Sequence, residues 1–182
     1  DPERIFILPN CVDLTRYGSG AKSPALVSRY GLAGKRVIMT LGRIEPDERF
    51  KGIDEVIDIL PDMVRADPNI VYMIAGTGDD CARLQQKAEA LGVGDHLIFT
   101  GLVAEAEKAD HFRLADAFVL ASRGEGFGIV LIEALACGVP VVGSRLDGGS
   151  EALLGGTLGR LADPDDAAEL KAAILGALDA PN

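Results

Sequence analysis

Short apolar runs alternate with helical segments along most of this chain of 182 residues. The runs are rich in β-branched residues and lack strict polar alternation, which is typical of parallel strands buried on both faces. The expected strands cover residues 36–41, 70–75, 96–100, 117–121 and 140–143, with a weaker sixth at 158–161. The expected helices cover residues 53–65, 80–91, 105–114, 129–137, 150–154 and 165–178. This order predicts right-handed βαβ units and a doubly wound, mostly parallel α/β sheet.

The first 30 residues do not follow this repeat. We therefore expect an irregular lead-in over residues 1–30, followed by a single domain over residues 31–182. The opening Asp1-Pro2-Glu3-Arg4 contains no initiator Met and is typical of mid-protein sequence, so we expect an excised domain. No apolar run reaches the roughly 18 residues that a membrane span needs, and no signal peptide opens the chain.

Charge and cysteine content exclude some classes of function. The formal net charge of −10 argues against binding to nucleic acid or to an anionic membrane, since both need a face rich in Lys and Arg. The three cysteines, Cys11, Cys81 and Cys137, are odd in number and widely spaced. This spacing disfavours a disulfide framework or a zinc site and indicates a reducing, cytoplasmic setting.

Residues 122–142 contain the strongest chemical signal in the sequence. A helix that is apolar on most of its circumference is normally buried, yet the one expected here carries Glu133. A buried charge costs several kcal/mol, so Glu133 needs a partner unless its side chain reaches solvent at the helix edge. Glu125 and the turn Gly126-Phe127-Gly128 come just before the helix, although Glu125 alone also fits an exposed loop charge. The pattern predicts a ligand site.

The spacing of the two glutamates limits their chemistry. Glu125 and Glu133 are eight residues apart, which a continuous helix would convert to about 12 Å. The carboxyl groups of a retaining glycosidase lie only about 5 Å apart, so a nucleophile and acid pair is disfavoured. An ionised carboxylate only accepts hydrogen bonds, so we expect two separate roles as acceptors of ligand hydroxyl groups.

Ligands of open α/β sheets bind outside the carboxyl ends of the strands, so the loops after the strands are expected to contain the site. The loop after the first strand places Arg43 at the strand end and Lys51 at the start of the next helix. These two cations are expected either to converge on one anion, with a diphosphate as the obvious choice, or to be solvated surface charges.

Glycines mark three further loops. Gly76-Thr77-Gly78 begins like a dinucleotide fingerprint, but Cys81 stands where the third glycine belongs, so a tight turn is favoured over an NAD site. We expect the loop Thr100-Gly101-Leu102-Val103 to offer backbone groups to a base. We expect the N–H groups of Gly148-Gly149 to face the same ligand. His96 and His111 suggest no catalytic triad or metal cluster and are expected to be structural.

Together these segments resemble the C-terminal, donor-binding half of glycosyltransferase family 4, the "glycosyl transferases group 1" domain. This domain is one Rossmann-like half of the GT-B fold. The segments that carry the resemblance run in family order over nearly the whole chain: residues 9–13, 42–43, 51–52, 76–78, 101–103, 122–128, 133–142 and 148–149. The two glutamates with their GFG and GVPVV flanks are the specific part. Cys11 and the compact stretch of residues 151–161 depart from the family pattern.

The resemblance implies that this domain binds a nucleotide-diphosphate sugar and that the whole enzyme transfers the sugar with retention of configuration. Arg43 and Lys51 would contact the diphosphate and stabilise the leaving group without a metal or other cofactor. Glu125 would contact the donor sugar and Glu133 the ribose. The implied catalytic residues are Glu125, Arg43 and Lys51, and the implied donor-binding residues are Gly42, Gly101, Leu102, Val103, Gly126, Phe127, Gly128 and Glu133.

The same resemblance implies that an N-terminal half of the enzyme supplies the acceptor contacts, any catalytic base and any membrane contact. The isolated chain is then expected to bind a donor without turning it over. Two alternatives remain open from the sequence. One is another GT-B enzyme that acts on nucleotide sugars, such as an epimerase, and the other is a non-catalytic nucleotide-binding module.

Overall fold

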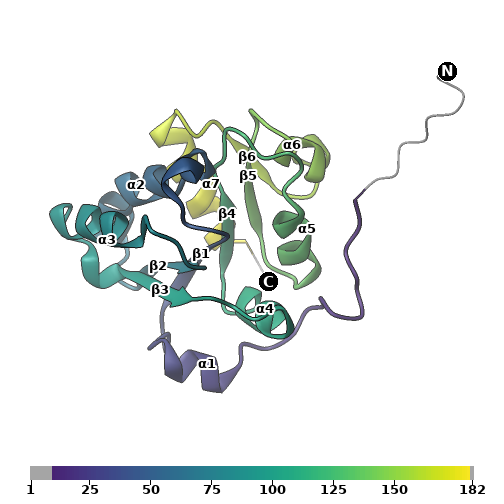
Figure 1. Ribbon diagram of the computed structural model, residues 1–182, viewed down its shortest axis with the longest axis horizontal. Helices are drawn as coiled ribbons and strands as arrows, with labels where there is room; N and C mark the ends of the chain where they lie inside the picture. Colours follow the sequence, from purple (N-terminus) through teal and green to yellow (C-terminus); the bar gives the residue numbers. More distant parts are fainter. Residues whose placement is uncertain (1–9, 181–182) are drawn as a thin grey trace, which may run out of the picture.

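Six parallel strands form one sheet in the order β3-β2-β1-β4-β5-β6 (Figure 1). The computed structural model describes residues 10–180. The strands are β1 (Arg36–Leu41), β2 (Ile70–Ala75), β3 (Leu97–Gly101), β4 (Ala117–Leu120), β5 (Val141–Ser144) and β6 (Arg160–Ala162). After β3 the chain crosses back to place β4 beside β1, so the strand order reverses between these two strands. This is the doubly wound, Rossmann-like arrangement predicted from the alternating pattern.

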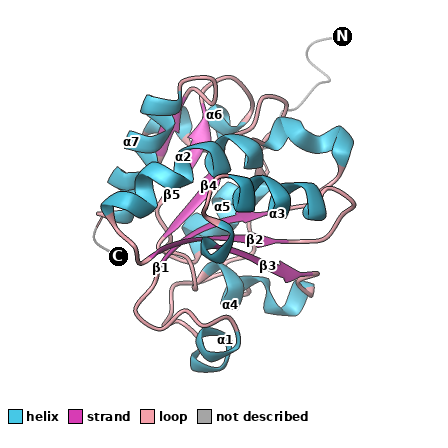
Figure 2. Cartoon of the chain, turned by 90° about the vertical axis from the view of Figure 1, so that its left-hand side faces the viewer, coloured by secondary structure: helices cyan, strands magenta, loops and turns pink. Residues whose placement is uncertain are grey.

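Helices cover both faces of the sheet, so that the strands lie between them (Figure 2). One face carries α2 (Ile53–Ala66), α3 (Cys81–Ala90) and α7 (Ala167–Leu178). The other face carries α1 (Pro24–Arg29), α4 (Lys108–Phe112), α5 (Ile129–Ala136) and α6 (Gly149–Ala152). Within residues 10–180 there are also four short 3₁₀ helices: η2 (Pro46–Lys51), η3 (Gly94–His96), η4 (Glu105–Glu107) and η5 (Leu154–Gly156).

The two helical layers bury two separate hydrophobic clusters. Successive strand residues point to opposite faces, so Ile38 packs under α2 and α7 while its neighbours Val37 and Met39 pack under α4 and α5. All six residues of β2 are buried. Burial on both faces explains why these strands read as continuous apolar runs in the sequence.

The lead-in is more ordered than its sequence suggests. The irregular segment expected over residues 1–30 contains the helix α1, and Tyr17 ahead of it is buried against Phe112 of α4, with ring centroids 6.2 Å apart. Tyr17 and α1 make hydrophobic contacts with residues that are far away in the sequence. These contacts order the segment, although its local sequence pattern is weak. The residues before Asn10, including Pro9 and the opening Asp1-Pro2-Glu3-Arg4, lie outside the described residues.

Element boundaries differ from expectation mainly where elements are short. β1 and β2 match the predicted limits at both ends, whereas β6 begins two residues later than the predicted strand 158–161. The predicted helix 105–114 is divided into η4 and the shorter α4, and the predicted helix 150–154 into α6 and η5. Among the described residues, no helix combines the length and apolar character that a bilayer crossing requires.

Candidate functional site

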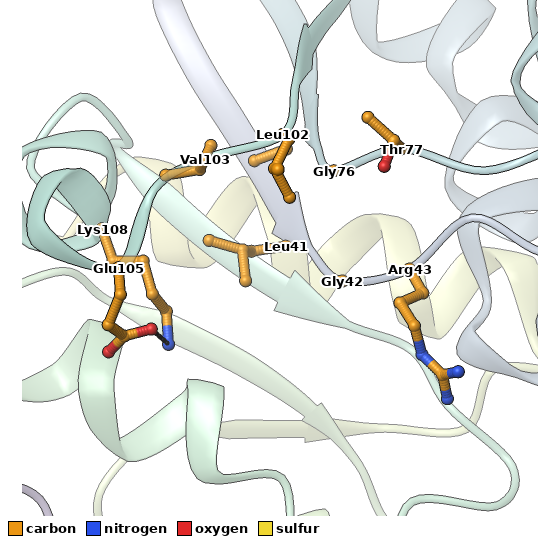
Figure 3. A pocket seen from close by; sticks show the side chains of 10 residues that line it. Leu41, Gly42, Arg43, Gly76, Thr77, Leu102, Val103, Glu105 and Lys108 are labelled. Carbon is orange, nitrogen blue, oxygen red and sulfur yellow. Dashed lines mark ion pairs between the residues drawn. The ribbon is translucent and has the colours of Figure 1, made fainter.

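A pocket of about 260 Å³ lies at the carboxyl ends of β1, β2 and β3 (Figure 3). Parallel α/β sheets bind their ligands at this edge, because the loops that follow the strands converge there. The pocket is lined by Leu41, Gly42, Arg43, Ala75, Gly76, Thr77, Leu102, Val103, Glu105 and Lys108. Arg43 lies on one side, and Glu105 and Lys108 lie on the other (Figure 3).

Several residues singled out in the sequence line this pocket. Gly42, Arg43, Leu102 and Val103 belong to its wall, and Gly101 directly precedes the last two. The loops after β2 and β3 are joined because the N–H of Gly76 donates a hydrogen bond to the carbonyl of Gly101, at 3.1 Å. The Gly76 loop leads into α3, in keeping with the tight turn favoured over an NAD site.

Lys51 is positioned by the glycine that follows it. Gly52 has φ +78°, and a Cβ atom there would lie 1.9 Å from the backbone oxygen of Ala121, so only glycine fits. Because of this close approach, the start of α2 lies directly against the end of β4. The approach also brings the Lys51 ammonium over the end of β1, where a Cβ atom on Gly42 would lie 3.3 Å from Nζ.

Arg43 and Lys51 converge on one carboxylate of their own loop. The Nζ atom of Lys51 lies 2.6 Å from Oε2 of Glu48 and 3.1 Å from the carbonyl oxygen of Arg43. The guanidinium of Arg43 pairs with the other oxygen, Oε1. The side chains of Glu48 and Lys51 are only 10% and 14% exposed, whereas that of Arg43 is 78% exposed. Glu48 was not singled out in the sequence, where it reads as one more charge in a charged loop.

The turn before α5 is fastened to the loop after β5. The N–H of Glu125 donates to Oδ2 of Asp147 at 3.0 Å, and the N–H of Gly148 donates to the carbonyl of Glu125 at 3.0 Å. A Cβ atom on Gly148 would lie 2.1 Å from the backbone oxygen of Gly126, so this contact also requires glycine. These bonds hold the turn that presents Glu125 and the N–H groups of Gly126, Phe127 and Gly128.

One expectation about this region is wrong. The N–H groups of Gly148 and Gly149 were expected to face the ligand, but both are used within the protein. Gly148 donates to Glu125, and Gly149 donates to Oδ1 of Asp147 at 2.9 Å. The carboxylate of Asp147 accepts hydrogen bonds from the N–H groups of Glu125 and Gly149, and no sequence pattern predicts these bonds. The two glycines therefore shape the turn of Glu125 and supply no free donor.

Glu133, on the second turn of α5, is 6% exposed and has a partner that sequence reasoning missed. The ammonium of Lys108 on α4 hydrogen-bonds to Oε1 at 3.0 Å and lies 2.9 Å from Oε2. Within the described part of the chain, Oε2 is nevertheless a buried acceptor that receives no well-directed hydrogen bond. No sequence pattern links Lys108 to Glu133. The two residues meet because α4, which precedes β4 in the chain, packs beside α5, which follows it.

Tyr17 joins the lead-in to this cluster. Its hydroxyl donates to Oε1 of Glu105 at 3.0 Å, and the Lys108 ammonium lies 5.7 Å from its ring centroid. Burial, followed by hydrogen bonding to Glu133 and Glu105, raises the pKa of Tyr17. The hydrogen bond from Tyr17 in turn lowers the pKa of Glu105. Tyr17 thus stays protonated and donates to Glu105, which lines the pocket.

Both histidines make structural contacts, as expected. The buried ring of His111 lies between the Tyr30 hydroxyl, 3.1 Å from Nε2, and the carbonyl of Glu107, 2.9 Å from Nδ1. Nδ1 of His96 lies 2.8 Å from the carbonyl of Ile70. Across residues 10–180, the structure places no group of three or more His, Cys, Asp or Glu side chains where they could hold a metal ion.

Comparisons with known proteins agree on one family. Residues 28–182 match the family model described as glycosyl transferases group 1. The chain is 36% identical over 175 residues to the GDP-mannose-dependent alpha-(1-6)-phosphatidylinositol monomannoside mannosyltransferase of Mycolicibacterium smegmatis, covering 92% of this chain and 45% of that protein. It is 38% identical over 173 residues to the phosphatidyl-myo-inositol mannosyltransferase of the same organism, covering 94% and 42%. The chain thus spans less than half the length of these relatives.

Solved structures show the same domain. HepE from Anabaena, in complex with UDP and glucose, superimposes with a TM-score of 0.79 at 27% identity, covering 93% of this chain and 46% of that one. The C-terminal domain of LpcC, a glycosyl transferase group 1 family protein from Francisella tularensis, has a TM-score of 0.75 at 25% identity, covering 88% and 84%.

Proposed function

Because this chain belongs to the glycosyl transferases group 1 family, we propose that it is the donor-binding half of a retaining glycosyltransferase of the GT-B fold. The donor is a nucleotide-diphosphate sugar, whose sugar the whole enzyme transfers to an acceptor. One observation carries the proposal: the pocket at the sheet edge has the Arg43 cation on one side and Glu105 with Lys108 on the other, and Lys108 is also paired with Glu133. A ligand with an anionic centre and hydroxyl groups fits this arrangement.

Arg43 and Lys51 are proposed to bind the diphosphate. A nucleoside diphosphate leaving group gains negative charge in the transition state, and cations fixed near it stabilise that charge. Gly52 fixes Lys51 over the strand ends, while the exposed Arg43 side chain has room to follow the ligand. Two such cations supply the positive charge locally, so we propose that no metal ion is required.

Glu133 is proposed to bind the ribose. Its Oε2 is a buried acceptor that receives no well-directed hydrogen bond, and a carboxylate can only accept. Its ion pair with Lys108 leaves this oxygen able to accept a further hydrogen bond. A ribose hydroxyl would supply such a donor, and an apolar ligand would not.

The contacts to the donor sugar and to the base are proposed to lie along the same edge of the sheet. We propose that Glu125 accepts hydrogen bonds from the donor sugar, whose oxygens are also met by the N–H groups of Gly126, Phe127 and Gly128. We propose that the base lies against Gly101, the last residue of β3, and against Leu102 and Val103, which follow it. One similar protein is named as GDP-mannose-dependent, and another is in complex with UDP and glucose in its crystal structure. A binding experiment therefore needs both GDP and UDP.

The acceptor is proposed to bind an N-terminal half that this chain does not contain. The relatives are more than twice as long as the aligned region. We therefore propose that the chain binds donor but transfers no sugar by itself. Sugar transfer by the purified chain would overturn this part of the proposal and leave donor binding intact.

Thermal unfolding in the presence of UDP, GDP, ADP and NAD, and of the matching nucleotide sugars, tests donor binding. A ligand at about 100 times its dissociation constant adds about 2.7 kcal/mol of stability. For a domain of this size that is a rise in Tm of several degrees. The expected result is a rise with one nucleoside diphosphate and its sugar, unchanged by EDTA. Loss of the rise with EDTA would contradict metal independence.

Arg43→Ala is expected to reduce that rise strongly. Arg65→Ala is the matched control, because Arg65 is as exposed as Arg43 and carries the same charge but lies at the last turn of α2, at the opposite end of the sheet. A response to NAD alone, or equal responses of the two variants, would overturn the proposed donor site.

A further inference from the structure

The carboxylate of Glu48 pairs with both of the cations that are proposed to bind the diphosphate. One oxygen, Oε2, lies 2.6 Å from Nζ of Lys51, and the other, Oε1, pairs with the guanidinium of Arg43. A diphosphate would use the two cations in a similar way, with separate oxygens on each. The described structure thus contains an anion of the protein where the proposed function places an anion of the ligand.

Burial makes this internal pairing strong. The side chains of Glu48 and Lys51 are both close to fully buried, so water screens their attraction weakly. Other nearby charges do not divert Glu48, because the next cation along the chain, Arg49, makes its hydrogen bonds to Asp80 at 2.8 and 3.1 Å. The three side chains of Arg43, Lys51 and Glu48 together carry a single positive charge instead of two.

We propose that Glu48 is an internal anion that competes with the donor diphosphate for Arg43 and Lys51. The inference rests on the proposed function, since it needs these cations to bind the diphosphate. Lys51 stays in place through Gly52 and through its second hydrogen bond, to the carbonyl of Arg43. The exposed guanidinium of Arg43 is the group that moves from Glu48 to the ligand.

This competition lowers the affinity for every diphosphate and acts most strongly on the most charged one. A free nucleoside diphosphate carries more negative charge than a nucleotide sugar, because the sugar esterifies its terminal phosphate. The repulsion from Glu48 is therefore larger for the product than for the donor. Glu48 thus acts as a specificity-determining residue that favours the donor over the released nucleotide.

Isothermal titration of the chain with UDP and GDP tests this competition. Glu48→Gln keeps the size of the side chain and an acceptor oxygen for Lys51 but removes the charge. Removing one unit charge close to a bound anion is expected to tighten nucleoside diphosphate binding by about threefold to tenfold. Asp47→Asn is the matched control, since it removes the same charge from the neighbouring exposed residue. It is expected to change affinity by less than about twofold, because solvent screens an exposed charge.

Three further measurements separate competition from a structural effect. The gain in Glu48→Gln is expected to be larger for the nucleoside diphosphate than for the nucleotide sugar, and absent for the nucleoside without phosphate. It is also expected to disappear in the Arg43→Ala background. Glu48→Ala provides a second variant with the same expected direction in case glutamine does not fit.

The outcomes distinguish this inference from the proposed function. If Arg43→Ala weakens nucleotide binding but Glu48→Gln and Glu48→Ala bind no tighter than Asp47→Asn, only the competition is overturned. If Arg43→Ala leaves nucleotide binding unchanged, or if no nucleotide binds to the chain or to any variant, the proposed donor site and the competition are both overturned.

Discussion

The ammonium of Lys108 lies 3.0 Å from Oε1 of Glu133, and this ion pair connects the helices on either side of β4 in the chain. Both side chains are largely buried, at 15% and 8% exposure. Lys108 lines the pocket at the sheet edge, and Glu133 behind it has one well-bonded oxygen and one buried oxygen that receives no well-directed hydrogen bond among the described residues. The negative charge of Glu133, which is conspicuous in the sequence, is thus compensated by Lys108, which no sequence pattern singles out.

Lys108→Met is expected to destabilise the fold by about 3 kcal/mol, because it leaves the buried carboxylate of Glu133 without its cation. Chemical denaturation of the variant measures this loss. Adding Glu133→Gln to Lys108→Met is expected to recover part of it, since the uncompensated charge is removed. A double variant that is less stable than Lys108→Met would contradict a charge-pairing role for Lys108.

Glu133→Gln is expected to weaken binding of a ribonucleotide by about tenfold, because the amide accepts from a hydroxyl less strongly than a carboxylate does. The 2′,3′-dideoxy form of the same nucleoside diphosphate is expected to bind wild type and variant about equally. Titration calorimetry with both nucleotides gives the comparison. Glu151→Gln, on the exposed side of α6, is the control and is expected to preserve the preference for ribose. Equal ribose preference in Glu133→Gln would exclude ribose binding by Glu133.

Asp80→Asn is expected to lower stability by about 2 kcal/mol near neutral pH. Asp80 is buried and accepts hydrogen bonds from Arg83, at 2.6 and 2.8 Å, and from Arg49. These bonds, with those from Arg83 the larger cause, hold the pKa of Asp80 well below its ordinary value of 3.8. The unfolded chain therefore binds a proton at a higher pH than the folded chain does, and stability rises with pH across this range.

The difference between wild type and Asp80→Asn is thus expected to be constant from neutral pH down to about pH 5. It should shrink below about pH 4, as the pH falls from the unfolded pKa towards the folded one. Thermal melts from neutral to acid pH measure it. Asp95→Asn, at an exposed position in η3, serves as the control. A difference that grows on acidification would contradict the lowered pKa of Asp80.

Gly52→Ala is expected to destabilise the chain by more than about 3 kcal/mol and to weaken nucleotide binding. The substitution meets both a positive φ of +78° and a backbone oxygen 1.9 Å from the new Cβ. Gly34→Ala is the control, since φ there is +72° but nothing lies within 4 Å of the added atom. It is expected to cost only about 1–2 kcal/mol for the left-handed backbone. Equal effects of the two variants would show that the contact with Ala121 is unimportant.

Elements with a strong local pattern are the ones that sequence reasoning places correctly. Residues 36–41 and 70–75 form β1 and β2 within the predicted limits, because both strands are buried on both faces and their composition has a single interpretation. The helix α1 and the short β6 are set by packing against distant segments, so their local sequence is a poor guide. The predicted lead-in over residues 1–30 therefore contains ordered structure in its described part.

The sequence by itself determined the parallel α/β architecture, the edge of the sheet that carries the pocket, and loops that line this pocket. These follow from periodicity and from glycine positions, which act within a few residues of each other. Only the tertiary structure decided which charges meet: Lys108 with Glu133, and Glu48 with Arg43 and Lys51. Such pairs depend on how helices and loops pack over the strand ends, and the attraction between two charges leaves no periodic trace in the chain.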